Sequence, residues 1–383
     1  MLLSHAAPVL SSTPPGGEDP DISSLLEMLG TVTDPRSPQG RRHRLVFVLA
    51  GAASFRHAGD HAADIPQDML AKLGAKWSWF KRKYLAPSEA TIRRVLQKID
   101  PAELDLAVGA WLFERARRGR GDELLIALDG KVMRGAWTDE NGQFTLFSAM
   151  IHSRGVPVGQ VAVPADTTEV TQVEALVKTI PVEPGNTIFT LDAAHTQRET
   201  AECIHQRGAF YVMTVKGNQP TLRAAVFKKC LPLVKTPGHV VEDRDHGRIK
   251  RWETWVTDAA GIDFPHVEQL ACIRRDVFDL DGVRVSKEYA LVVTDVPADR
   301  AGPAELHTYV RGHWGIENKE HWVRDDTWRE DANQSYVGNG QHSMAALRNL
   351  ALGLLRLNGF GEIKRTTEWI CRDRNRALPL LAT

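Results

Sequence analysis

The sequence predicts an α/β fold in which a mixed sheet carries the functional groups and a helical region precedes the sheet. Two apolar runs each end in an aspartate, one at Asp129 and the other at Asp192, and a helical pattern lies between them. In an α/β sheet, side chains that follow the carboxyl ends of neighbouring strands converge on one edge, where ligands bind. We therefore expect Asp129 and Asp192 to face a common site.

The N-terminal quarter of the chain is predicted to be a tail followed by a basic helical region. Residues 1–20 are rich in Pro, Gly and Ser, which is typical of a disordered segment. A helical region is expected over 21–118. Between Thr31 and Lys98 there are 13 Lys and Arg against 5 Asp and Glu, a difference of 13 − 5 = +8. This local excess favours contact with phosphates, although solvated basic loops are common.

Two segments of the basic region are predicted to contact DNA. The loop DPRSPQGRRHR contains Arg41 and Arg42. The segment PSEATIRRVLQKID predicts a helix with Ser88 as its N-cap, an apolar inner face, and Arg93 and Arg94 on its outer face. A short helix after a turn, with cations on its exposed side, is how a helix-turn-helix reader is built, but many ordinary surface helices share this pattern.

The middle of the chain alternates between strand and helix patterns. After Asp129, FTLFSAMIHSRG and PVGQVAVPA predict strands, DTTEVTQVEALVKTI predicts a helix, and AFYVMTVKGNQP predicts a strand that ends in a polar turn. Residues 119–238 are accordingly expected to form the first part of an α/β core. Residues 239–300 have strand patterns and are expected to be a β-rich insertion, and 301–383 supply the last part of the core.

The stretch Leu306–Asp331, LHTYVRGHWGIENKEHWVRDDTWRED, contains no Pro and predicts one helix. Residues three, four and seven apart share a face of an α-helix, which would put His313, Glu317, His321 and Arg324 on one stripe. Such a helix could deliver Glu317 into a polar site; a surface helix docked by one face is the alternative. The two histidines are about 12 Å apart along the axis, too far to share one zinc ion.

Two strand-end aspartates and one helix-borne glutamate suit a site for two hard metal ions. Mg²⁺, with Mn²⁺ as the alternative, prefers oxygen ligands and keeps positions open for water and phosphate. Two such ions can activate the attacking oxygen and stabilise the leaving oxygen of a phosphoryl transfer. Each acid alone is weak evidence, because an aspartate after a strand often caps a turn or helix.

Composition excludes few classes of protein. The 383 residues carry 48 basic and 48 acidic side chains, so no global field marks a nucleic-acid binder. The four cysteines have no paired spacing, which indicates a reducing compartment. No apolar run approaches the length of a membrane span and the N-terminus lacks the layout of a signal peptide. A cytoplasmic protein without membrane contact is expected.

Several motifs in a fixed order resemble one known family. They are DPRSPQGRRH, PSEATIRRVL, LDGK, LDAAHTQRE, VKGNQ, HGRIKRW and RGHWGIENKEHWVRDDTWRED, and they cover nearly the whole chain. The set resembles the bacterial insertion-sequence transposases of the ISAs branch of the DDE superfamily, also called H-repeat-associated proteins. Any single motif is unspecific, whereas the ordered set is highly specific.

This resemblance implies a ribonuclease-H-like core interrupted by a β insertion, with a DDE triad of Asp129, Asp192 and Glu317. The triad would hold the metal ions, with Asp129 bridging both. In related transposases a cation seven residues after the glutamate contacts DNA near the cut, and Arg324 stands at that position here. The chain departs from the branch at Glu320 and Arg324, where leucine is usual, and at Asp326, which replaces an apolar residue.

The resemblance also implies the activity and the partners. The expected enzyme cleaves and joins DNA phosphodiesters at the terminal inverted repeats of its own element, and it acts as a homodimer on double-stranded DNA. Alternatives are a domesticated relative that binds DNA without cutting it and a metal-dependent nuclease without strand transfer. A DNA channel would be lined by Lys131, Lys216, Arg248 and Arg251, and support of the site or phosphate contacts would come from His195, Asn218, His313 and His321.

Overall fold

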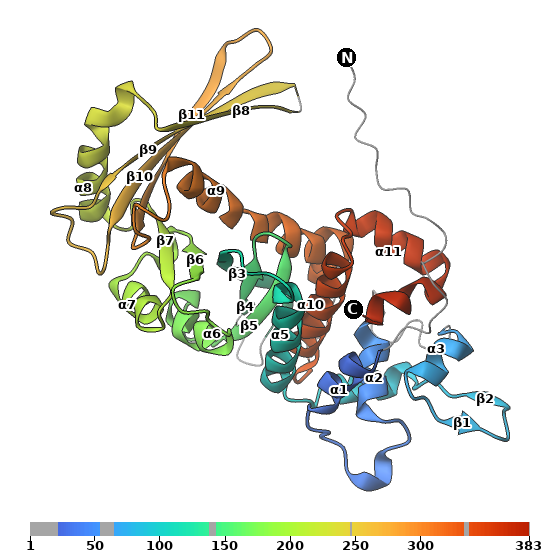
Figure 1. The fold of residues 1–383 in the computed structure, drawn as a ribbon. Helices are drawn as coiled ribbons and strands as arrows, with labels where there is room; N and C mark the ends of the chain where they lie inside the picture. Colours follow the sequence, from blue (N-terminus) through green and yellow to red (C-terminus); the bar gives the residue numbers. More distant parts are fainter. Residues whose placement is uncertain (1–21, 54–64, 138–142, 246, 333–336, 383) are drawn as a thin grey trace.

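A nine-stranded sheet and a group of helices, lying side by side, make up the fold (Figure 1). The computed structural model describes residues 22–53, 65–137, 143–245, 247–332 and 337–382. The expected tail at 1–20 lies outside the described residues. Mixed α/β architecture with one large mixed sheet is therefore confirmed.

The helical part begins with short helices and one long one. They are α1 (Ser23–Gly30), α2 (Leu45–Ala53), α3 (Gln67–Lys72), α4 (Glu89–Leu96) and α5 (Pro101–Arg117). Between α3 and α4 the chain forms a two-stranded hairpin from β1 (Trp77–Ser78) and β2 (Lys83–Tyr84).

Helix α4 forms as its sequence predicts. The hydroxyl of Ser88 accepts a hydrogen bond from the Thr91 N–H at 3.3 Å and so satisfies one of the free donors at the helix start. Its apolar residues are buried, whereas Arg93 and Arg94 are exposed.

The sheet is mixed, and its strands do not follow sequence order. They are β3 (Leu124–Trp137), β4 (Gln143–Ile151), β5 (Val156–Val163), β6 (Thr187–Leu191), β7 (Phe210–Val215), β8 (His239–Asp245), β9 (Arg248–Asp258), β10 (Gln269–Phe278) and β11 (Arg284–Thr294). Their order is β5-β4-β3-β6-β7-β11-β10-β9-β8. Only β3 with β6 and β6 with β7 pair in parallel. Every residue of β6 is buried, as a continuous apolar run in a covered parallel sheet requires.

The predicted β segment after residue 238 extends the core sheet. Its four strands β8–β11 join the other five because β11 pairs with β7, for example Leu291 with Val215. Two helices cover opposite faces of this extension, α8 (Pro220–Cys230) and α9 (Pro303–His313). Leu270 and Cys272 pack in the hydrophobic cluster on one side, and Ala271 and Ile273 in the cluster on the other.

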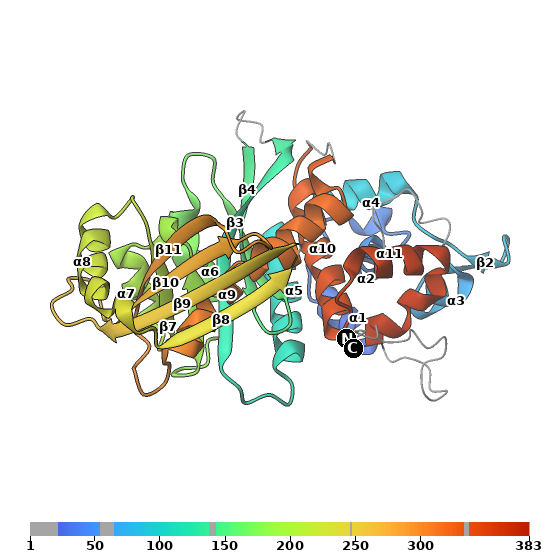
Figure 2. The same cartoon turned by 90° about the horizontal axis from the view of Figure 1, so that it is seen from above.

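The remaining helices complete the layers. They are α6 (Val173–Thr179), α7 (Arg198–Gln206), α10 (Gly340–Leu357) and α11 (Ile363–Arg372). Helix α10 packs against both α5 and β5 and so joins the helical part to the sheet (Figure 2). A Cβ atom at Gly109 would lie 2.6 Å from the Val158 carbonyl oxygen, so glycine is needed for α5 to lie directly on β5. Within the described ranges, no helix is both long and apolar enough to cross a membrane.

Candidate active site

The first two acids of the predicted triad are brought together by strand register. Leu128 of β3 pairs in parallel with Leu191, the last residue of β6, and Asp192 follows directly. Asp129 is the next residue within β3, which continues to Trp137, so the prediction that this strand ends at the acid is wrong. Adjacent strands lie about 4.8 Å apart, so the two aspartates project from neighbouring backbones. Asp192 also accepts a 3.0 Å hydrogen bond from the Ala194 N–H, which fixes the turn that follows the strand.

A third carboxylate, Glu169, was not predicted from the sequence and lies directly over this pair. It begins a short 3-10 helix, Glu169–Gln172, before α6. A Cβ atom built on Gly130 would overlap the Glu169 carboxylate, so glycine after Asp129 leaves room for the incoming acid. The segment DTTEVTQ was interpreted only as the start of a helix. The glycine in LDGK was the one signal in the sequence that another group approaches the backbone there.

His195 lies beneath these acids and is completely buried. Its ring stacks on Phe147 with centroids 4.7 Å apart. Its Nε2 atom is 3.6 Å from Glu169 Oε1 and 3.9 Å from Asp192 Oδ1, distances too long for hydrogen bonds. Neither ring nitrogen has a hydrogen-bond partner among the described residues. A buried, unsatisfied imidazole aimed at two carboxylates is unusual in a purely structural position.

The stretch that carries Glu317 is helical, but it is not one regular α-helix. Helix α9 ends at His313, and the chain continues as π-helical turns over Glu317–His321 and Val323–Thr327. A π-helical turn is wider than an α-helical one, so residues four and seven apart no longer share a face. The predicted common stripe is therefore wrong: Glu317 is exposed, whereas His313, His321 and Arg324 are buried.

The stretch nevertheless delivers side chains to the aspartates. Glu317 is close enough to act electrostatically on Asp129. His321 comes from the same turn and places its Nδ1 atom 3.6 Å from Asp129 Oδ2. His313 lies deeper, with its Nδ1 atom 3.1 Å from the Thr190 hydroxyl. Trp314 and Trp322, at 49% and 54% exposure, flank Glu317 in sequence and present aromatic surface to solvent.

The electrostatics of the site disfavour simultaneous ionisation of all four carboxylates. Burial raises the pKa of Asp129, and the neighbouring charges of Asp192, Glu169 and Glu317 add to this rise, so that the pKa reaches about 7. The nearby His321 imidazole does not offset this negative charge, because burial and the charges of Arg324 and Lys131 lower its pKa to about 3. No Lys or Arg in the described part of the chain forms an ion pair with any of these four acids. The arrangement therefore favours binding of an external cation.

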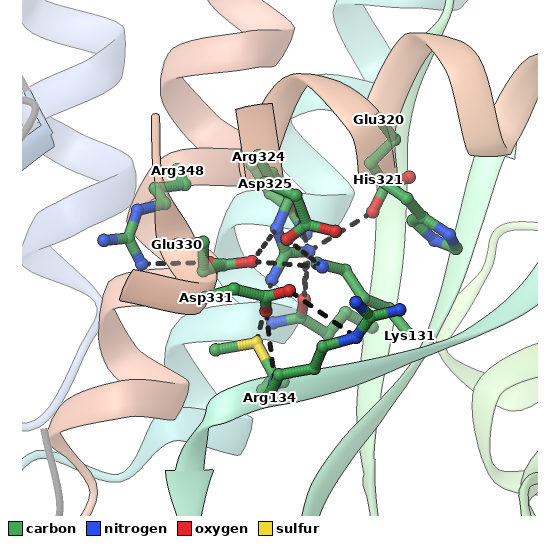
Figure 3. A network of polar contacts seen from close by, with 12 residues as sticks. Lys131, Arg134, Glu320, His321, Arg324, Asp325, Glu330, Asp331 and Arg348 are labelled. Carbon is green, nitrogen blue, oxygen red and sulfur yellow. Dashed lines mark hydrogen bonds and ion pairs between the residues drawn. The ribbon is translucent and has the colours of Figure 1, made fainter. Parts of the chain in front are cut away.

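Arg324 does not face the site or the solvent, which corrects its predicted role as a DNA contact. Its side chain has no exposed surface and lies in a network of polar contacts (Figure 3). It pairs with Glu330 at 2.7 Å and with Glu320 at 3.4 Å. Further contacts come from Gln160 on β5 and Asn349 on α10. The π-helical turns rotate Arg324 away from Glu317 and into the interior, so no DNA can reach it in this conformation.

The predicted role of Lys131 in lining a DNA channel is wrong for the same reason, the burial of its side chain. It is 3% exposed, and its ammonium group contacts Asp325 and lies 3.9 Å from Glu330 (Figure 3). Arg348 adds a third cation to the network and pairs with Glu330 at 2.9 Å. Burial opposes ionisation of Glu330, but Arg324 and Arg348 outweigh it and lower the pKa of this acid to about 2. The departures from the family pattern at 320 and 324 thus form one matched buried pair.

The other predicted contact residues are dispersed over the molecule. Those with exposed side chains are Arg41, Arg42, Arg93, Arg94, Lys216, Arg248 and Arg251. Lys216 lies close enough to lower the pKa of His313, which places it at the rim of the site. Asn218 anchors the same rim by donating a 2.6 Å hydrogen bond to the Ala193 carbonyl. Arg251 is partly engaged, because it pairs with Glu253 at 3.1 Å.

The residues present fit hard cations, although they do not form a finished metal site as they stand. In the described ranges no three His, Cys, Asp or Glu side chains are already arranged around one point. The donor set is nonetheless four carboxylates without Lys or Arg partners among the described residues, all of them at least partly exposed, and it matches the oxygen preference of Mg²⁺.

Comparison with known proteins identifies the family. The family model described as the Transposase DDE domain matches residues 120–354, and the model described as DDE_Tnp_1-associated matches 26–112. YncI from Escherichia coli O157:H7, provisionally named a transposase, is 28% identical over 357 residues, covering 88% of each chain. YhhI from Escherichia coli K12, provisionally named an H repeat-associated transposase, is 26% identical over 390 residues, covering 94% of this chain and 98% of its own. The chain belongs to the Transposase DDE domain family, with H repeat-associated proteins among its relatives.

Proposed function

We propose that this protein is a DDE transposase that cleaves and joins DNA phosphodiesters at the terminal inverted repeats of its insertion sequence. The observation that carries the proposal is the pair Asp129 and Asp192 on adjacent parallel strands, with Glu317 near enough to act on Asp129. We propose a ribonuclease-H-like core for the same chain. The central position of β3, between antiparallel β4 and parallel β6, supports it.

Mg²⁺ or Mn²⁺ would be held by Asp129, Asp192 and Glu317. Such ions activate a water or 3′-hydroxyl nucleophile and stabilise the leaving oxygen of a phosphodiester. Glu169 adds a fourth carboxylate whose charge raises the local preference for divalent cations. His195 supports the site from below through its approach to Glu169 and Asp192.

Other exposed groups around the site would position DNA. Lys216 at the rim suits a phosphate contact. Trp314 and Trp322 present faces on which an unpaired base could stack. The exposed cations of the N-terminal region, Arg42 and Arg94 among them, would hold duplex DNA farther from the cut. Synapsis of two element ends would require two copies of the chain.

The proposal is tested with Asp192→Asn in the full-length protein, on DNA that carries the sequences flanking the reading frame. The wild type is expected to nick this DNA only with Mg²⁺ or Mn²⁺. The variant should cut at least about 10³-fold more slowly, because metal ions supply several kcal/mol of transition-state stabilisation. Its DNA affinity should be retained. Asp263→Asn, at a side chain 93% exposed, is the matched control and should cut normally.

Three outcomes would contradict the proposal. A wild type that binds the ends and never cuts them with either metal ion would be the non-catalytic DNA binder. A wild type that nicks DNA but does not join pre-cut ends to a target would be the nuclease without strand transfer. Equal cutting by the wild type and Asp192→Asn would remove Asp192 from the site.

A further inference from the structure

The hairpin between α3 and α4 ends in an exposed aromatic tip. Trp77 pairs with Tyr84 and Ser78 with Lys83, which leaves Trp79–Arg82 as the turn. The hairpin projects from the helical part of the molecule, on the side away from the nine-stranded sheet (Figures 1 and 2). Trp79 is 86% exposed and Phe80 is 97% exposed. Two large aromatic side chains left in water at one tip indicate a binding surface.

The tip is a built structure. The Trp77 ring packs edge-on against Tyr84 at 5.0 Å and against Trp79 at 6.3 Å, so the aromatic rings support one another. The Lys81 N–H donates a 3.2 Å hydrogen bond to the Ser78 hydroxyl across the turn. Arg82 adopts the left-handed region with φ of 48°, which an arginine rarely does outside a tight turn. These contacts fix the turn that carries the exposed Trp79 and Phe80.

Cations surround the tip, and no acid lies nearby in sequence. The hairpin carries exposed Lys76, Lys81, Arg82 and Lys83, and residues 74–87 contain no Asp or Glu. Its base is continuous with the basic loop, because Lys76 lines one surface pocket together with Arg41, Arg42 and Arg44. The one acid in this pocket, Asp34, is paired with Arg41, which leaves the pocket with an excess of cations. A patch of this composition attracts a polyanion, and the aromatic tip requires that the polyanion also offer flat apolar surface. Nucleic acid offers both phosphates and base faces.

We propose that the tip of this hairpin is a DNA wedge, in which Trp79 and Phe80 stack on bases at an opened step while the flanking cations hold the phosphates. The proposal rests on the proposed function only in taking DNA as the substrate. Aromatic and apolar side chains inserted at a base step unstack it and kink the duplex. The wedge would lie at a distance from Asp129 and would act on DNA inside the element end rather than at the cut.

The test measures binding of the full-length Asp192→Asn protein in EDTA, so that catalysis plays no part. The two DNA probes are a duplex and the same duplex with a central two-base mismatch, each carrying 2-aminopurine beside the step. We expect tighter binding to the mismatched duplex and a rise in 2-aminopurine fluorescence. Trp79→Ala with Phe80→Ala should lose the preference by about 10-fold or more, since one base–aromatic stack contributes about 1–3 kcal/mol.

Matched variants separate stacking from charge. Trp79→Phe with Phe80→Trp exchanges the rings and should restore both the preference and the fluorescence rise. Lys81→Ala with Lys83→Ala should weaken binding to both DNAs alike and lower the salt dependence by about one ion per lysine. Both sites are exposed, so these changes leave the fold intact.

Several results would overturn the wedge. One is equal affinity of the protein with the unchanged tip for the matched and the mismatched duplex. Another is a variant with Trp79→Ala and Phe80→Ala that still prefers the mismatched duplex. Loss of binding to anionic vesicles, with DNA binding unchanged, would assign the tip to a membrane surface. A change from dimer to monomer, with DNA binding unchanged, would assign it to a second copy of the chain. Failure of DNA cleavage by the wild type leaves this measurement unaffected.

Discussion

Two acids that lie near each other in this protein, Glu330 and Asp129, obey opposite electrostatics. In the cluster around Arg324, buried Glu330 pairs with Arg324 and Arg348, and its pKa falls to about 2. In the cluster around Asp129, the acids face one another without Lys or Arg partners among the described residues, and the pKa of Asp129 rises to about 7. The first cluster is neutralised internally and supports the fold. The second leaves its negative charge for a cation from outside.

The largest effect is expected from breaking the neutralised cluster. Arg324→Met removes the cation and leaves Glu330 buried beside a single remaining arginine. Loss of one partner of a buried ion pair lowers the free energy of unfolding by about 3–5 kcal/mol. Urea denaturation at pH 7 measures this loss. Arg93→Met, at an exposed pair with Glu89, should change stability by less than about 1 kcal/mol; a comparable loss at both sites would contradict the contrast.

A change of opposite sign is expected in the second cluster. Because the folded-state pKa of Asp129 is raised, the folded chain keeps a proton that the unfolded chain releases, and stability falls as pH rises from about 4 to about 7. Asp129→Asn cannot titrate, so the metal-free variant should be more stable than the wild type by up to about 4 kcal/mol at pH 8, the equivalent of the rise of the Asp129 pKa from 3.8 to about 7. The same comparison at pH 4 should show little difference. Denaturation in EDTA at pH 4 and pH 8 measures the difference. An equal gain in stability at the two pH values would show that the effect does not come from the raised pKa of Asp129.

Addition of a divalent cation should remove part of that difference. Mg²⁺ at tenfold above its dissociation constant would stabilise the wild type by about 1.4 kcal/mol. Asp129→Asn should gain little, because one of the proposed ligands is lost. Thermal unfolding with MgCl₂, against KCl at the same ionic strength, separates binding from screening. A similar increase in both proteins would place the ion elsewhere.

The smallest effect is expected from Glu169, whose charge is one of several acting on Asp129. Glu169→Gln should lower the pKa of Asp129 and raise the stability of the metal-free protein at pH 8 by at most about 1.4 kcal/mol, the equivalent of one pKa unit. Mg²⁺ should bind the variant more weakly. Glu174→Gln, at an exposed side chain paired with Lys178, provides the matched control and should alter neither quantity.

Sequence reasoning singled out Asp129 and Asp192 because each acid follows an apolar run, and the structure places them on neighbouring chain segments, although the strand of Asp129 continues to Trp137. It missed Glu169 because the polar segment DTTEVTQ has no periodic signal, and only the tertiary fold carries it over Gly130. The acid at 317 was found through the motif around it, but its helical face was assigned wrongly. The spacing of charged residues does not indicate where a helix adopts π-helical turns, so the burial of Arg324 could not be predicted from the sequence.

Strand pairing shows the same limit at a larger scale. The strand patterns after residue 238 were evident in the sequence, whereas the strand they pair with was not. Pairing between β11 and β7 depends on contacts between residues far apart in the chain, such as Val215 and Leu291, which are 291 − 215 = 76 positions apart. The exposed cations on α4 were predicted because a capped helix with one apolar face leaves little choice for its other side.

The sheet is continuous from its outer strands to the strands next to the two aspartates. From β8 to β6 the strands are joined edge to edge by hydrogen bonds, through β9, β10, β11 and β7. A force applied at the far edge is therefore transmitted to the strand before Asp192 without passing through a flexible linker. Any partner bound to β8 and β9 would therefore have its position fixed relative to Asp129 and Asp192.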